Sequence, residues 1–144
     1  TPYKLPDDPR LRHIDWLARL TPYMPKNTEA PGSGWFGDVW KEYHVSYPQN
    51  PLRSVGQLMR LIAEMQAALP QIKVPVLLIH SRDDNYVVKD SMPLIYEHLT
   101  TPDKQMLWIE GSGHVITEEP KREQVYQAAA DFVKRVEGKG TSNE

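Results

Sequence analysis

The chain has 144 residues, 40% of them hydrophobic and 25% charged, which is the size and composition of one folded domain. Its formal net charge of −2 comes from 17 basic and 19 acidic residues, with no basic stripe, so no nucleic-acid partner is expected. The absence of cysteine excludes disulfides, thiolate metal sites and cysteine nucleophiles, and no apolar run approaches the roughly 18 residues of a membrane span.

The proline-rich segment 1–51 holds eight of the thirteen prolines and predicts a helix and loops rather than a sheet. One helical pattern starts at Asp8-Pro9 and places Ile14, Leu17 and Ala18 on one side. Large aromatics interleaved with glycines follow, a mixture that favours irregular backbone and could roof a pocket; these aromatics are Tyr23, Trp35, Phe36, Trp40, Tyr43 and Tyr47.

A second helix is predicted over 55–69, where apolar residues recur at helical spacing and Pro70 ends the pattern. Its apolar positions are Val55, Leu58, Met59, Ile62, Met65 and Leu69.

From residue 72 the pattern changes to strand, helix, strand, helix. The run 74–79 is apolar throughout, as expected of a parallel strand covered on both faces. Asp90 is the candidate N-cap of a helix that buries Ile95 and Leu99, and the second strand spans 106–109. A last helix begins near 117–120, and its predicted buried positions are Val125, Ala128, Ala129, Phe132, Val133 and Val136.

Two strands alone make a marginal sheet, so we expect them to complete a larger parallel sheet whose earlier strands precede this sequence. The first residues show neither an initiator methionine nor a signal-peptide pattern, which also places the true N-terminus elsewhere. We expect a cytoplasmic protein, in keeping with the lack of cysteine.

Candidate catalytic groups follow both strands. Asp83 and Asp84 lie beyond the first strand, and His114 lies in the loop Gly111-Ser112-Gly113-His114 beyond the second. Because the carboxyl ends of parallel strands lie along one edge of a sheet, the two loops should emerge side by side. A histidine that acts as general base needs a carboxylate to fix its tautomer, and this pair has the right chemistry.

The nucleophile of such a triad is missing from the sequence. A serine on a strand-to-helix elbow needs glycine two residues before and two residues after it, and no serine here has both. Ser112 has Glu110 and His114 at those positions, so it is interpreted as a loop residue. A metal site built on His80 and the residues above is disfavoured, because no tight ligand spacing such as H-E-x-x-H occurs.

Residues 72–136 resemble the C-terminal third of an α/β-hydrolase of the carboxylesterase and monoacylglycerol lipase type. The resemblance is carried by 72–84, which reads IKVPVLLIHSRDD, and by 113–117, which reads GHVIT. It implies that Asp84 is the acid and His114 the base of a Ser-Asp-His triad, with Asp83 as the competing acid. Val87, an aliphatic residue three positions after Asp84, fits the family pattern and is a candidate substrate contact.

The resemblance also implies a domain organisation and a fold class. Residues 1–70 would form a helical, proline-rich cap, 71–137 the C-terminal β-α-β-α portion of an α/β-hydrolase sheet, and 138–144 a disordered tail. The N-terminal half of that fold would be absent. Trp35, Phe36 and Trp40 would either line the acyl pocket or form the small core of the cap.

The leading hypothesis is therefore a serine hydrolase segment that acts on carboxylic esters with medium or long acyl groups. It would need no cofactor or metal, and its partners would be the acyl ester and the preceding half of the same polypeptide, which carries the serine and the oxyanion donors. Alone it should be inactive. The alternatives are a non-catalytic binding or assembly module that self-associates as a homo-oligomer, and another α/β-hydrolase chemistry such as dehalogenation or carbon–carbon hydrolysis.

Overall fold

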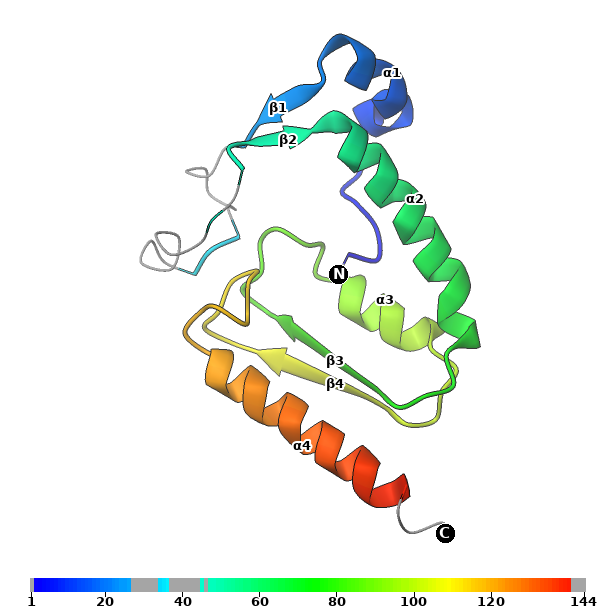
Figure 1. The fold of residues 1–144 in the computed structure, drawn as a ribbon, viewed down its shortest axis with the longest axis vertical. Helices are drawn as coiled ribbons and strands as arrows, with labels where there is room; N and C mark the ends of the chain where they lie inside the picture. Colours follow the sequence, from blue (N-terminus) through cyan, green and yellow to red (C-terminus); the bar gives the residue numbers. More distant parts are fainter. Residues whose placement is uncertain (1, 27–33, 37–44, 46, 141–144) are drawn as a thin grey trace.

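The computed structural model describes residues 2–26, 34–36, 45 and 47–140 of the chain (Figure 1). The described part is an α/β structure with a small parallel sheet, preceded by helices and a short antiparallel ribbon. Within it, no helix has the length and apolar character needed to cross a membrane.

The first helical segment forms where the sequence predicts it. A 3-10 turn, η1 (Pro9–His13), leads directly into α1 (Ile14–Leu20), and the Asp8 carboxylate accepts a hydrogen bond from the Arg10 N–H at 2.9 Å. Ile14 and Ala18 are buried against Leu52, which attaches α1 to the start of the next long helix.

The expectation of helix and loops without a sheet in 1–51 is wrong at one place. β1 (Tyr23–Pro25) and β2 (Gln49–Pro51) pair antiparallel, with Met24 opposite Asn50. Each strand has three largely exposed residues and ends in proline, so neither shows the alternation of apolar and polar residues by which a strand is recognised. The ribbon depends on pairing between segments more than twenty residues apart, which local sequence does not reveal.

The second predicted helix is α2 (Leu52–Ala68), followed by the 3-10 turn η3 (Leu69–Gln71). It begins three residues before Val55, because the extended backbone of Pro51 directly precedes Leu52 as the first helical residue. Leu69 is buried as predicted, whereas Leu58 lies at the exposed margin of the apolar stripe.

The second half of the chain forms the predicted β-α-β-α unit: β3 (Val76–Ser81), α3 (Ser91–His98), β4 (Lys104–Ile109) and α4 (Arg122–Gly140). The two strands are parallel, with Ser81 opposite Ile109 at their carboxyl ends. The predicted Ile95 and Leu99 are buried, although the Asp90 side chain makes no cap hydrogen bond.

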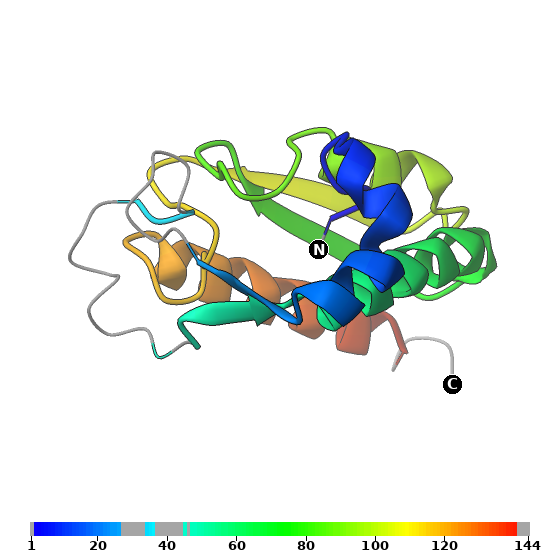
Figure 2. The same ribbon diagram turned by 90° about the horizontal axis from the view of Figure 1, so that it is seen from above.

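The helices α3 and α4 cover opposite faces of this strand pair (Figures 1 and 2). Val76 and Leu78 pack against the cluster of Leu69, Ile95 and Leu99 on the α3 side. Leu77, which points to the other face, shares a hollow with Phe132 of α4. The alternation along β3 thus divides its side chains between two helical layers.

Burial of the strand and of the last helix is less complete than predicted. β3 starts at Val76, after Pro75, which has no N–H for the ladder, and all its residues except Ser81 are half-buried. Only β4 pairs with it among the described residues. On α4, Val125 is buried and Ala128, Phe132 and Val136 half-buried, whereas Ala129 and Val133 are exposed. The helix continues to Gly140, past the predicted tail boundary at Gly138, because a glycine costs a helix only about 1 kcal/mol.

Candidate active site

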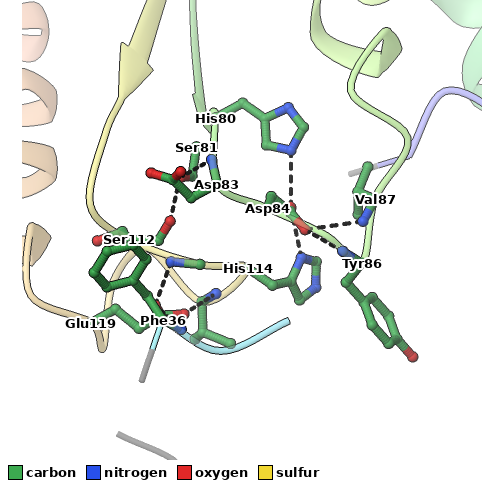
Figure 3. A network of polar contacts seen from close by, with 12 residues as sticks. Phe36, His80, Ser81, Asp83, Asp84, Tyr86, Val87, Ser112, His114 and Glu119 are labelled. Carbon is green, nitrogen blue, oxygen red and sulfur yellow. Dashed lines mark hydrogen bonds and ion pairs between the residues drawn. The ribbon is translucent and has the colours of Figure 1, made fainter. Parts of the chain in front are cut away.

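The loops that leave β3 and β4 meet at the carboxyl edge of the sheet (Figure 3). The strand register places Ser81 opposite Ile109, and the Arg82 N–H donates to the Ile109 carbonyl at 2.9 Å, so the loops diverge from neighbouring points. This arrangement brings Nδ1 of His114 to 3.0 Å from Oδ2 of Asp84, across thirty positions of sequence. The predicted acid and base are therefore in hydrogen-bond contact.

Asp84 is almost completely buried, with 2% of its surface exposed, and is surrounded by hydrogen-bond donors. Oδ1 accepts from the backbone N–H groups of Tyr86 at 2.7 Å and Val87 at 3.0 Å. Burial raises the pKa of the carboxyl, but the hydrogen bonds from His114, His80 and the two backbone groups together hold this pKa well below its ordinary value. The group is therefore ionised at neutral pH.

An ionised carboxylate can only accept hydrogen bonds, so Nδ1 of His114 must carry the proton that it shares with Asp84. In the neutral imidazole this leaves Nε2 with a free lone pair, which is the atom a general base uses. The His114 side chain is 36% exposed, and the Tyr86 ring lies against it with ring centroids 4.9 Å apart. The imidazole is thus fixed on one side and accessible on the other.

Asp83, the competing acid, has another contact. Its Oδ2 accepts the backbone N–H of Gly111 at 2.7 Å. Gly111 has φ of +77°, a left-handed conformation that side chains rarely adopt, which explains why glycine is needed there. Asp84 therefore contacts His114, whereas Asp83 binds the start of the loop that carries His114.

A buried glutamate, which sequence reasoning did not single out, organises the far side of this loop. Glu119 is completely buried, and its carboxylate accepts three backbone N–H groups, from Phe36 at 3.1 Å, from Val115 at 2.9 Å and from Gly113. The only sequence signal was its place five residues after His114, inside a turn predicted merely as a helix start. Its hydrogen bonds connect the loop to segment 34–36.

Segment 34–36 lies directly against the histidine. The His114 N–H donates to the Gly34 carbonyl at 2.5 Å. A Cβ on Gly113 would lie only 2.2 Å from that same oxygen, so no other residue fits at position 113 without moving the backbone. Gly113 is thus needed because another backbone segment lies close to it, and Gly111 is needed because the turn requires a positive φ.

The serines near the site are structural. Ser112 is buried, its Oγ accepts the Lys121 N–H at 3.1 Å just before α4, and its carbonyl accepts a hydrogen bond from Ser81 Oγ. The interpretation of Ser112 as a loop residue agrees with these contacts.

Three of the four predicted substrate contacts lie in the described part of the chain. Val87 is buried and bonded through its N–H to Asp84, Trp35 is half-buried, and Phe36 is 43% exposed and held to Glu119 through its N–H. Trp40 lies outside the described residues. Val87 thus contacts the acid through its backbone, and Phe36 contacts the glutamate that holds the histidine loop. Contact of these residues with substrate stays a prediction.

His80, considered in the sequence only as a metal ligand, contacts the acid instead. Its Nε2 lies 2.9 Å from Oδ2 of Asp84. In the part of the chain that the structure describes, no group of three or more His, Asp or Glu side chains is arranged to hold a metal ion.

Comparison with known proteins identifies the family of this chain. The family model described as serine aminopeptidase, S33, matches residues 42–121, more than half of the chain. This chain belongs to that α/β-hydrolase family. The matched segment includes α2, both strands, Asp84 and His114.

Two curated relatives are named as ester hydrolases. The chain is 31% identical over 97 residues to a carboxylesterase of Bacillus subtilis (strain 168), covering 67% of this chain and 39% of that protein. It is 26% identical over 109 residues to a thermostable monoacylglycerol lipase of Bacillus sp. (strain H-257), covering 76% of this chain and 43% of that protein. The chain therefore spans about two fifths of the length of these curated relatives.

Solved structures show the same fold. A metagenome-derived lipolytic enzyme matches 93% of this chain with a TM-score of 0.80 and 25% identity, over 52% of its own length. The monoacylglycerol lipase of Paleococcus ferrophilus matches 92% of this chain with a TM-score of 0.71 and 18% identity, over 54% of its length. The described structure thus corresponds to about half of an α/β-hydrolase.

Proposed function

We propose that this chain supplies the acid and the base of a Ser-Asp-His triad that hydrolyses carboxylic esters of the kind that esterases and monoacylglycerol lipases accept. The observation that carries the proposal is the 3.0 Å contact between His114 Nδ1 and the buried, ionised Asp84. The names of the relatives support the ester class of substrate.

In this proposal His114 Nε2 takes the proton of a serine hydroxyl as the serine oxygen attacks the ester carbonyl. The imidazolium then returns the proton to the leaving alcohol, and a water molecule repeats the sequence to release the acid. Asp84 keeps the imidazole in the right tautomer and stabilises its positive charge. The serine and the oxyanion donors come from a segment outside these 144 residues, because no serine here has the flanking glycines.

We further propose that the part N-terminal to residue 71 is the cap, and that Trp35 and Phe36 face the acyl chain. The support is the contact of segment 34–36 with the histidine loop through Gly34 and Glu119.

The test is His114→Ala in the protein that carries this chain together with its nucleophile, assayed with p-nitrophenyl esters. We expect kcat to fall by at least about a thousandfold, since triad members act as a unit. The matched control is His98→Ala, because His98 ends α3 on the side where β4 begins, away from Asp84. Normal turnover by the His114 variant would end the assignment.

A further inference from the structure

His80 contacts the same carboxylate oxygen as the proposed base. It is the fifth residue of β3, and its Nε2 lies 2.9 Å from Oδ2 of Asp84, which His114 approaches at 3.0 Å from the other loop (Figure 3). Because the carboxylate only accepts, Nε2 of His80 carries the proton of this hydrogen bond. Two imidazoles from different elements therefore donate to one oxygen.

The acceptor capacity of Asp84 is fully used. A carboxylate offers about four lone-pair positions, and Asp84 fills them with two backbone N–H groups on Oδ1 and two imidazoles on Oδ2. Since only 2% of Asp84 is exposed, bulk water cannot readily replace a lost donor. Removal of His80 would leave Oδ2 with a single partner and free the carboxylate to turn away from its present plane.

The imidazole of His80 is itself held by the sheet. Its register partner on β4 is Trp108, and the two rings stack with centroids 5.6 Å apart and planes 23° apart. The guanidinium of Arg82 lies 4.6 Å from the Trp108 ring, and the His80 side chain is only 13% exposed. The strand pair therefore fixes the direction from which His80 donates to Asp84.

We propose that His80 is a positioning residue of the hydrolase, which holds Oδ2 of Asp84 in line with Nδ1 of His114 by donating a hydrogen bond to that oxygen. This inference rests on the proposed function. His80 acts through Asp84 alone, and the quantity that it controls is the alignment of the base during the chemical step.

The experiment compares His80→Leu with His80→Gln in the protein that carries this chain together with its nucleophile. Glutamine places an amide N–H near the position of the imidazole Nε2, whereas leucine has no donor. Loss of one hydrogen bond to a charged group should lower kcat roughly ten- to a hundredfold in His80→Leu, and KM should change by less than about twofold. His80→Gln should recover most of the kcat, and His98→Leu should match the wild type.

Far-UV circular dichroism and the thermal unfolding midpoint of each variant separate misfolding from misalignment. Equal kcat for the leucine and glutamine variants, whether both normal or both reduced, would overturn the donor role. If His114→Ala is inactive while His80→Leu turns over normally, this inference alone fails. If His114→Ala remains active, the proposed function fails instead.

Discussion

Hydrogen bonds, more than apolar packing, hold the Asp84 carboxylate in place. Four donors surround a carboxylate that is 2% exposed, and the two that arrive through the backbone, from Tyr86 and Val87, belong to its own loop. The loop's own backbone therefore supplies two of the four donors to the acid. Such a group should make the stability of the protein depend on pH.

For Asp84 the direction of this dependence follows from its lowered pKa. The unfolded carboxyl has a pKa of about 3.9, so the stability that Asp84 provides is nearly complete above about pH 5. It is lost as the pH falls toward the lower pKa of the folded state, because the unfolded chain binds the proton first. We expect the wild-type free energy of unfolding to decrease more steeply with acid than that of Asp84→Asn, by up to about 1.4 kcal/mol per pH unit. Urea unfolding at a series of pH values from 3 to 7 measures both slopes, and identical slopes would contradict the prediction.

Some residues of the site could be predicted from the sequence and others could not, for a physical reason. Asp84 and His114 stand in short loops directly after apolar strands, so their positions could be predicted from the strands. His80 and Glu119 act through hydrogen bonds that no apolar pattern announces. The His80 partner, Asp84, lies only four residues later, and Glu119 binds the nearby Val115 and Gly113 as well as the distant Phe36. The resemblance favoured Asp84 over Asp83 through the spacing to Val87, and in the structure it is the Asp84 carboxylate that contacts the imidazole, whereas Asp83 accepts the Gly111 N–H.

Among the elements, the histidine loop, residues 111–114, and segment 34–36 form one unit, because their backbones are in direct contact. The Gly34 carbonyl accepts the His114 N–H, and Glu119 binds Phe36 and Gly113 at once. Position 113 is where this unit is least tolerant, since a Cβ there would lie 2.2 Å from the Gly34 oxygen and 2.8 Å from the Phe36 nitrogen, both backbone atoms.

We therefore expect Gly113→Ala to lower the free energy of unfolding by about 1–3 kcal/mol, the range found for overpacking. In the longer protein that also carries the nucleophile, it should lower the proposed esterase activity, because His114 moves with its loop. Gly138→Ala is the matched control. A Cβ at Gly138 meets nothing within 4 Å, and alanine should stabilise α4 by up to about 1 kcal/mol. Chemical unfolding curves of both variants test the pair, and a Gly113→Ala protein as stable as the wild type would refute the close contact.

Helices and parallel strands could be predicted because each has a repeating apolar pattern of its own. The exceptions are informative. The β1–β2 ribbon consists of two exposed three-residue strands that end in proline, and it is defined only by their mutual hydrogen bonds. The α4 stripe was overestimated at Ala129 and Val133, because helical spacing identifies an apolar face without showing how wide the surface that covers it is.

For the molecule as a whole, the feature that matters most for self-association is the parallel sheet, whose described part has two strands. Every residue of β3 except Ser81 is half-buried although its sequence is that of a strand covered on both faces. Among the described residues only β4 pairs with β3, which leaves open one edge of a six-residue strand whose first four residues are apolar. Such an edge is a template for pairing with another chain.

The 144 residues produced on their own should therefore self-associate, whereas a longer protein that supplies the neighbouring strand should be monomeric or form defined oligomers. Light scattering after size-exclusion chromatography measures the mass of both, and binding of a hydrophobic dye reports the exposed apolar face. A dye-negative, compact monomer of the 144 residues would show that the open edge needs no partner. A folded dimer of the 144 residues, together with no esterase activity in the longer protein, would favour the binding module over the hydrolase.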